Sequence, residues 1–392
     1  MTSPDKKPPL TWINVVIFLG FPLAALVLVP WWGITHGYDA FQWLWAVAFL
    51  YLNGLSITGG YHRLWAHKSY QAHPVLKWFY AFWGAGALQN SILIWASDHR
   101  RHHRHVDDND HDPYSAGRGL WFSHIGWMLR EYDTNEQDYS NSPDLLKDPV
   151  VLWQDKHYVP LTTFMNLGLP ILLGIWHGDI IGTVLLVGLL RLVVNHNVTF
   201  FINSLAHYWG RRPYTEANSA RDNDILAFLT YGEGYHNYHH IFQTDYRNGI
   251  RWFHWDPTKW LIAACSRVGL TRNLNRVPDF KIQRAMLDTA FERARTKMDE
   301  NLASETLREM VEREYQLFAE SINQWTALQS ERYERKKEQL GDALEERKAH
   351  LQQSWENAAL MGRVKALEYT LKMQRKRLRL LVEQIPLQPQ PA

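Results

Sequence analysis

This chain of 392 residues contains one cysteine, Cys265, and carries a formal net charge of only +2. A single cysteine excludes an internal disulfide and an iron–sulfur cluster held by cysteine ligands. The small net charge lacks the basic excess typical of nucleic-acid-binding proteins, so we expect no nucleic-acid partner. We also find no fused segment with a haem-binding or flavin-binding pattern. Electrons for any redox chemistry would therefore come from a separate donor.

Hydrophobic residues are unevenly distributed. They form 46% of the sequence, yet the mean hydropathy is mildly negative, because a long charged tail dilutes a strongly apolar first part. Four apolar segments have about the 20 residues that a helix needs to cross a bilayer, and they are residues 12–32, 41–60, 158–176 and 180–202. Their short connections predict two helical hairpins. The sequence thus predicts an all-α integral membrane protein, with residues 12–278 forming the membrane domain.

Charge predicts the orientation of these spans. Residues 1–11 contain two lysines, the connection 33–39 contains no lysine or arginine, and the segment after the second span is rich in both. Positive charge favours the cytoplasmic side, so residues 1–11 and the segment after the second span are expected there. The first span lacks a small-residue cleavage site and is interpreted as an anchor. Residues 75–95 must begin and end on one side, which predicts an interfacial or shallow re-entrant helix.

Polar residues interrupt the fourth span: Arg191, Asn195, Asn197, Asn203 and Ser204. Polar groups at membrane depth are costly unless they face a protein interior or a cavity. We expect this face to point towards substrate and metals, with Arg191 more often a bridge between helices than a ligand.

The character of the sequence changes over residues 279–384. Helix-forming charged residues dominate and apolar residues recur at helical spacing. This predicts a helical extension, either a hairpin or bundle or a coiled coil, with possible breaks at Gly341 and Gly362. The final residues 385–392 are expected to be a disordered end.

Three short histidine clusters follow the apolar segments. Two of them, His99, His102 and His103, and His236, His239 and His240, have the spacing of residues on one helical face. The pair His62 and His67 differs, because a five-residue step turns about 140° around an α-helix. We therefore expect the helix to end or unwind between them.

Such clusters indicate a metal centre. Neutral nitrogen ligands without thiolates suit iron, copper, zinc or nickel better than magnesium or calcium. Zinc usually binds four ligands, whereas eight histidines suit two ions of higher coordination number. Paired iron is the usual means of activating dioxygen for attack on a hydrocarbon. Beside apolar helices, this centre predicts an oily substrate.

The motifs HRLWAH, DHRRHH and GEGYHNYHH, with NSLAH before the third, closely resemble those of membrane acyl-CoA desaturases of the stearoyl-CoA type over about residues 40–265. The resemblance implies nine histidine ligands, namely those above and His207, and two iron ions (Fe2+). It implies one iron held by His62, His67, His103 and His240, with Asn203 holding a bound water. The other iron would be held by His99, His102, His207, His236 and His239.

The resemblance also implies how the acyl chain is held. Gln89, Trp95 and Thr199 would bend it at the metals, which favours the ninth carbon, and Leu50 and Gly54 would lie along the tunnel floor. Residues 127–132 contain only Arg130 where animal relatives place several cations against the CoA phosphates. Arg100, Arg104 and Arg118 are the alternatives, and a phospholipid carrier remains open.

The function that follows is O2-dependent insertion of a cis double bond into saturated C16–C18 acyl-CoA, with electrons from a ferredoxin, flavin reductase or cytochrome b5 type of donor. The alternatives are an acyl-lipid desaturase, a membrane di-iron fatty-acid or alkane hydroxylase and, more remotely, a non-enzymatic metal-binding membrane protein. Topology fits a bacterial inner membrane with the site on its cytoplasmic side, and an endoplasmic-reticulum membrane would look similar.

Overall fold

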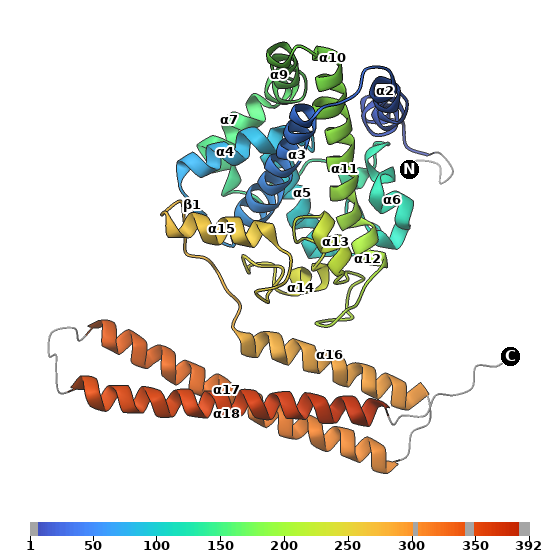
Figure 1. Cartoon of the computed structure of the whole chain (residues 1–392). Helices are drawn as coiled ribbons and strands as arrows, with labels where there is room; N and C mark the ends of the chain where they lie inside the picture. Colours follow the sequence, from blue (N-terminus) through green and yellow to red (C-terminus); the bar gives the residue numbers. More distant parts are fainter. Residues whose placement is uncertain (1–6, 301–304, 342–348, 384–392) are drawn as a thin grey trace. The chain divides into compact units, whose positions relative to one another are not determined.

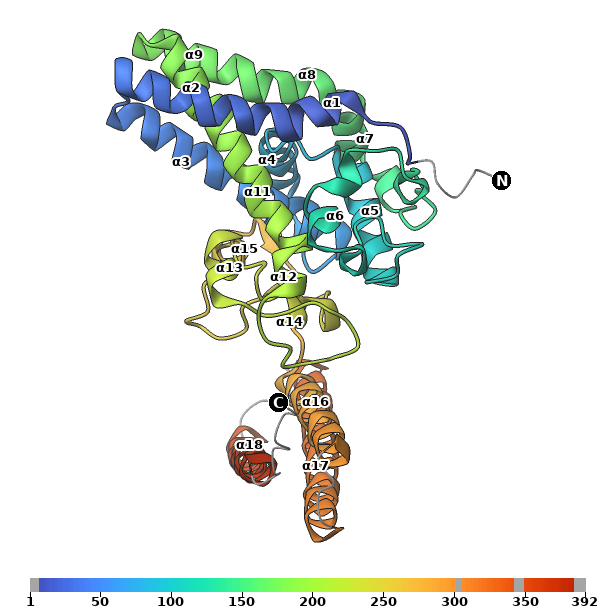
Figure 2. The same cartoon turned by 90° about the vertical axis from the view of Figure 1, so that its right-hand side faces the viewer.

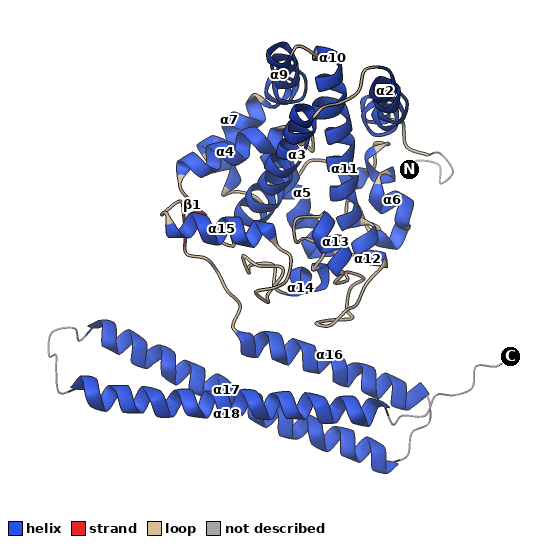
Figure 3. Ribbon diagram, in the orientation of Figure 1, coloured by secondary structure: helices blue, strands red, loops and turns tan. Residues whose placement is uncertain are grey.

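The structure is a computed structural model that describes residues 7–300, 305–341 and 349–383 (Figure 1). The chain divides into two compact units, Met1–Arg212 with Glu216–Val277, and Pro278–Ala392 with Pro213–Thr215. Helices dominate both units. Within the described residues, the strands form one antiparallel pair, β1 (Gln71–Ala72) with β2 (Thr271–Arg272) (Figure 3). The all-α class is therefore confirmed.

Four helices of the first unit are long and apolar enough to cross a membrane, as the sequence predicted, and they are Trp12–Thr35, Ala40–Ala66, Tyr158–His177 and Ile180–Tyr208. Figure 2 shows them gathered at one end of this unit. Their outer faces expose large apolar side chains such as Leu26, Ile34 and Val159, which suit contact with lipid. This chain is a membrane protein.

The spans alternate between α-helical and wider π-helical segments. The first consists of α1 (Trp12–Val15), η1 (Val16–Gly20) and α2 (Phe21–Thr35). The second consists of α3 (Ala40–Leu55) and η2 (Ser56–Ala66). The third consists of α8 (Tyr158–Thr163), η7 (Phe164–Gly168) and α9 (Leu169–His177). The fourth consists of α10 (Ile180–Thr183), η8 (Val184–Leu190), α11 (Arg191–Asn203) and, after Ser204, α12 (Leu205–Tyr208).

The single interfacial helix expected over residues 75–95 is two helices, α4 (Pro74–Ala85) and α5 (Ile92–His105). Between them the backbone turns through left-handed conformations at Leu88 and Asn90, with φ of 52° and 73°. The Ser91 hydroxyl then accepts a hydrogen bond from the backbone N–H of Ile94 and begins α5. The break matters because it carries Gln89 out of a helix.

The remaining elements of the first unit lie after α5 and after the fourth span. The first set is η3 (Ala116–Arg118), α6 (Leu120–His124), η4 (Gly126–Met128), η5 (Asp133–Asn135), η6 (Leu145–Lys147) and α7 (Pro149–Lys156). The second set is α13 (Asp224–Leu229), α14 (His236–Ile241) and α15 (Pro257–Arg267).

Some polar residues of the fourth span contact other parts of the protein, and others line a cavity. Arg191 is 2% exposed and donates hydrogen bonds to the carbonyl of Gly86 and to Oδ1 of Asn166, each at 2.9 Å. It bridges helices, as expected. Asn197 donates to the carbonyl of Val193 within its own helix. Among the five residues predicted to form this face, only Asn203 lines the cavity, so the expectation that it points to the substrate holds for Asn203 and is wrong for the other four.

The described residues of the second unit form a bundle of three helices, α16 (Asp279–Glu300), α17 (Glu305–Gly341) and α18 (Ala349–Glu383). Their shared core includes Phe291, Phe318 and Trp325. The bundle, rather than an extended coiled coil, is thus what the charged extension forms. Gly362 lies inside α18, so the break expected there is wrong, and the expected disordered end 385–392 lies outside the described residues.

Candidate metal centre

Nine histidines from five places in the chain converge in the first unit. His62 lies in η2, His67 directly follows it, α12 contributes His207, and α5 and α14 each contribute three. They form two groups in which all the ligand nitrogen atoms lie within 4.8 Å of one another. The five-histidine group is His62, His67, His99, His103 and His239. The four-histidine group is His102, His207, His236 and His240.

This grouping corrects the division that the resemblance implied. His99 and His239 belong with the five-histidine group, and His240 belongs with His207 and His236. The reason is helical geometry. A step of four residues overshoots one full turn by about 40°, whereas a step of three falls short by about 60°. His99 and His103 therefore both face the five-histidine group, while His102 faces the four-histidine group. In α14, His236 and His240 both face the four-histidine group, while His239 faces the five-histidine group.

The five-residue step from His62 to His67 is accommodated by the π-helix. The backbone N–H of His67 donates to the carbonyl of His62 at 3.0 Å, which is the i to i+5 hydrogen bond of that helix. The helix thus widens and then ends at Ala66, as the sequence predicted. The centroids of the His62 and His67 rings lie 4.7 Å apart.

The spacing of the ring nitrogens fits metal ions. The Nε2 atoms of His62 and His239 lie 2.9 Å apart, and those of His207 and His236 lie 3.0 Å apart. Two nitrogens bound at about 2.1 Å and at right angles to one ion would lie about 3.0 Å apart. In addition, Nε2 of His102 is buried without a hydrogen-bond partner among the described residues. These nitrogens have the arrangement of ligands.

Burial favours the neutral form of five of these imidazoles. Removal from water lowers the pKa of His99, His103 and His239 well below its usual range, and neighbouring imidazoles lower it further. The pKa values of His236 and His240 fall for the same reasons. The neutral ring is the form that binds a metal ion.

Acidic and hydroxyl groups hold the outer nitrogens of these rings. Nδ1 of His62 lies 2.9 Å from Glu233, and Nδ1 of His102 lies 2.9 Å from Asp112. Nδ1 of His99 lies 3.1 Å from the hydroxyl of Tyr114, and Nδ1 of His207 lies 2.8 Å from that of Ser219. Such contacts fix the ring orientation and direct Nε2 inwards. The sequence did not identify these residues, because their spacing from the histidines follows no local pattern.

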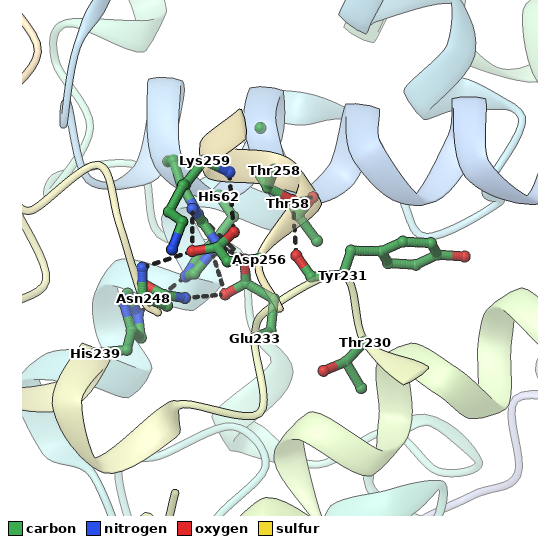
Figure 4. Close-up of polar contacts among 12 residues, drawn as sticks. Thr58, His62, Thr230, Tyr231, Glu233, His239, Asn248, Asp256, Thr258 and Lys259 are labelled. Atoms are coloured by element: carbon green, nitrogen blue, oxygen red, sulfur yellow. Dashed lines mark hydrogen bonds and ion pairs between the residues drawn. The ribbon is translucent and has the colours of Figure 1, made fainter. Parts of the chain in front are cut away.

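A buried ionic network supports Glu233. Arg63, which is 1% exposed, lies 2.8 Å from Glu233 and 3.0 Å from Asp256. Burial tends to raise the pKa of Glu233, but His62 and Arg63 outweigh it and lower that pKa overall. Figure 4 shows Glu233 and Asp256 close to His62. The network fixes one edge of the five-histidine group.

A cavity of about 730 Å³ reaches the histidines. His62, His99 and Asn203 line it, and so do Gln89, Trp95 and Thr199. Nε2 of Gln89 donates to the hydroxyl of Thr199 at 2.9 Å, and the ring of Trp95 stacks on His99 at 4.9 Å between centroids. The three residues expected to bend a substrate thus meet beside the metal centre. Gly54 also lines the cavity.

Two residues expected to bind substrate lie elsewhere. The Arg100 guanidinium pairs with Asp144 at 2.8 Å and donates to the carbonyls of Trp65 and Ala66. These internal contacts occupy it, so its assignment to the substrate is not supported. Arg118 is exposed and lies over the ring of Phe122 at 3.6 Å. Neither arginine lines the cavity, whereas Arg130 does.

Replacing Asp112 with asparagine is expected to weaken metal retention by about 10- to 100-fold, because the outer partner of His102 loses its charge. The measurement is release of the bound metal to a chelator over time, followed by metal analysis. Asp39→Asn is the control, since Asp39 also contacts a histidine, His177 at 2.7 Å, but belongs to no candidate metal group among the described residues. Equal retention in both variants would show that Asp112 does not support a ligand.

The fold and the site together define a membrane protein with a candidate histidine-rich metal centre beside a cavity. Residues 40–274 match the fatty acid desaturase family. The chain therefore belongs to that family, which confirms the resemblance seen in the motifs.

Three relatives illustrate the match. A probable acyl-CoA desaturase of Schizosaccharomyces pombe is 40% identical over 76% of this chain, which spans 62% of that relative. Stearoyl-CoA desaturase 5 of Bos taurus is 37% identical over 69% of this chain and 81% of the relative. An sn-2 palmitoyl-lipid 9-desaturase of Nostoc is 36% identical over 70% of this chain and 95% of the relative. The chain thus spans less than two thirds of the yeast protein.

Proposed function

We propose that this chain is an O2-dependent di-iron desaturase that inserts a cis double bond at the ninth carbon of saturated C16–C18 acyl-CoA. The observation that carries the proposal is the cavity, in which the Gln89–Thr199 hydrogen bond and Trp95 lie beside His62 and His99. The Nostoc relative is named a 9-desaturase, which favours the same carbon. The yeast and bovine names favour the CoA carrier.

The reaction converts two adjacent methylenes into a double bond. Dioxygen, two electrons from a separate donor and two protons are consumed, and the two hydrogens removed from the chain leave in two molecules of water. The donor is of the ferredoxin, flavin reductase or cytochrome b5 type. Two iron ions held by the two histidine groups would supply the activation of dioxygen.

The chain's own residues supply position. The hydrogen bond between Gln89 and Thr199 joins the break after α4 to α11 in the cavity wall, and we propose that an acyl chain bends where it passes this pair. The Trp95 ring, stacked on His99, makes the wall next to the five-histidine group. Holding one methylene pair in a fixed place is what selects it among chemically similar neighbours.

The carrier of the acyl chain has a second candidate, a phospholipid. Around Arg130, the cavity lining includes the carboxylates Glu131, Asp133 and Glu136, which would repel the phosphates of CoA. The Nostoc relative is named as acting on a palmitoyl lipid. This local charge is the observation that favours an acyl-lipid desaturase.

The decisive experiment gives vesicles containing the iron-loaded protein two alternative substrates, saturated C16 and C18 acyl-CoA or saturated phosphatidylcholine. Oxygen and a reducing system are added, and mass spectrometry locates any double bond. His99→Ala is the inactive control. A histidine-dependent double bond at the ninth carbon of acyl-CoA supports the proposal, unsaturation only in phospholipid replaces the carrier, and a hydroxylated product moves the chain to the hydroxylases.

We also place the site on the cytoplasmic side of a bacterial inner membrane. The basic residues that follow the second span, among them Lys68 and Arg101, lie on the side of the histidines, and the turn between α2 and α3 has none. A reporter enzyme that is active only outside the cytoplasm, inserted in the turn at Gly37, should be active. Activity after insertion beside Ala116 instead would reverse the orientation.

A further inference from the structure

Tyr231 adopts an unusual conformation between α13 and α14. Its φ is 57°, in the left-handed region that bulky residues rarely adopt, and its side chain is 5% exposed. The ring packs on Gly54 of α3 so closely that a Cβ atom there would lie 2.2 Å from ring carbons. The Tyr231 hydroxyl donates to the carbonyl of Leu50 at 3.1 Å. Only glycine at position 54 permits this contact.

Neighbouring hydroxyls hold the strained backbone. Oγ1 of Thr258 donates to the carbonyl of Tyr231 at 2.9 Å and lies 2.7 Å from Oγ1 of Thr58 in η2 (Figure 4). All three residues are buried. Unfavourable backbone conformations persist where the surroundings fix them, and they cluster at functional sites. The ring is therefore fixed from both sides, by Gly54 beneath it and by Thr258 behind its backbone.

Tyr231 and Gly54 lie at the inner part of the cavity. Both line it, together with Ile57, Thr58 and Thr230. Gly54 precedes His62 by eight residues in one continuous helix, which places it roughly 10 Å from His62 along the second span, towards the membrane interior. Arg130, by contrast, pairs with Leu10 just before the first span begins. The cavity thus runs from the membrane surface, past the histidines, to Tyr231.

We infer that Tyr231 closes the inner end of this cavity and sets the longest acyl chain that fits. The inference rests on the proposed desaturase function and names a residue that determines its substrate length. The methyl end of the chain meets the ring, which is held in place by its close packing on Gly54. Removal of the ring opens the space that it fills to additional methylenes.

The test compares acyl-CoA substrates of C16, C18 and C20 in competition. Tyr231→Gly removes the ring and also suits the left-handed backbone. Its C20 to C16 ratio of kcat/KM should rise by about tenfold or more, since even one methylene alters discrimination by about that factor. The double bond should remain at the wild-type distance from the thioester. Tyr231→Phe keeps the ring and should keep the wild-type ratio.

A second variant tests the contact from the other side. Gly54→Ala forces the Tyr231 ring into the cavity, which should lower the C18 to C16 ratio, and the same substitution in the Tyr231→Gly background should not. Thermal stabilisation of each variant by saturated acyl-CoA of each length provides a readout that needs no turnover. An active Tyr231→Gly variant with a wild-type C20 to C16 ratio overturns the inference. A wild-type protein that forms no double bond on any acyl-CoA overturns the proposed function instead.

Discussion

Replacing His239 with alanine is expected to abolish the proposed desaturation, with activity falling by at least about 100-fold, and to lower the metal content of the proposed di-iron centre from two ions per chain towards one. The Nε2 atom of His239 lies 2.9 Å from that of His62 and 3.0 Å from that of His103, at the middle of the five-histidine group. Loss of an outer partner typically costs about 10- to 100-fold, so loss of a ligand should cost more. Metal analysis and product analysis by mass spectrometry measure both effects.

His36→Ala is the matched control, because it also removes an imidazole but from an exposed position that belongs to no candidate metal group in the described part of the chain. It should retain the wild-type metal content and activity. Wild-type metal content and turnover in His239→Ala would show that this ring is not a ligand. A loss of both in His36→Ala as well would point to general damage to the protein.

Replacing Arg63 with methionine is expected to destabilise the protein by about 3–5 kcal/mol, because the carboxylates of Glu233 and Asp256 would remain buried without the guanidinium that pairs with both. These side chains are 2% and 0% exposed, so water does not replace the lost cation. A variant this unstable should unfold at a much lower temperature in detergent, and little of it should reach the membrane. Thermal unfolding followed by tryptophan fluorescence measures the loss.

Arg211→Met is the comparison for this result. Arg211 pairs with Asp224 at 2.7 Å, but both side chains are more than half exposed. Exposed pairs contribute about 0–1 kcal/mol, so this variant should unfold close to the wild-type temperature. If Arg63→Met were as stable as Arg211→Met, the buried network would not be a structural support for the five-histidine group.

The sequence predicted features that depend on local pattern. Apolar runs of sufficient length identified four spans, and the five-residue step from His62 to His67 predicted that the helix would not continue as an α-helix. Both follow from the geometry of a few neighbouring residues. The histidine clusters that form the candidate metal centre could be recognised in the sequence for the same reason.

Features that depend on distant contacts were missed or misplaced. Asp112 and Glu233 reach the histidines through folds of the chain that no spacing reveals. Arg100 lies in a histidine motif and looked available, but Asp144, 44 residues later, pairs with it. The break between α4 and α5 rests on left-handed backbone at Leu88 and Asn90, residues whose types do not demand it.

The π-helical segment Ser56–Ala66 also determines which kinds of mutation this region tolerates. Each hydrogen bond there spans one residue more than in an α-helix. The segment therefore has more residues per turn than an α-helix would need to cover the same distance. A substitution that preserves packing does not change the angle around the helix axis between the side chains of His62 and His67. Deletion of one residue would let the helix tighten without shortening the span appreciably, and it would turn one ring away from the other. We therefore expect natural variation in this segment to consist of exchanges of residues rather than changes in their number.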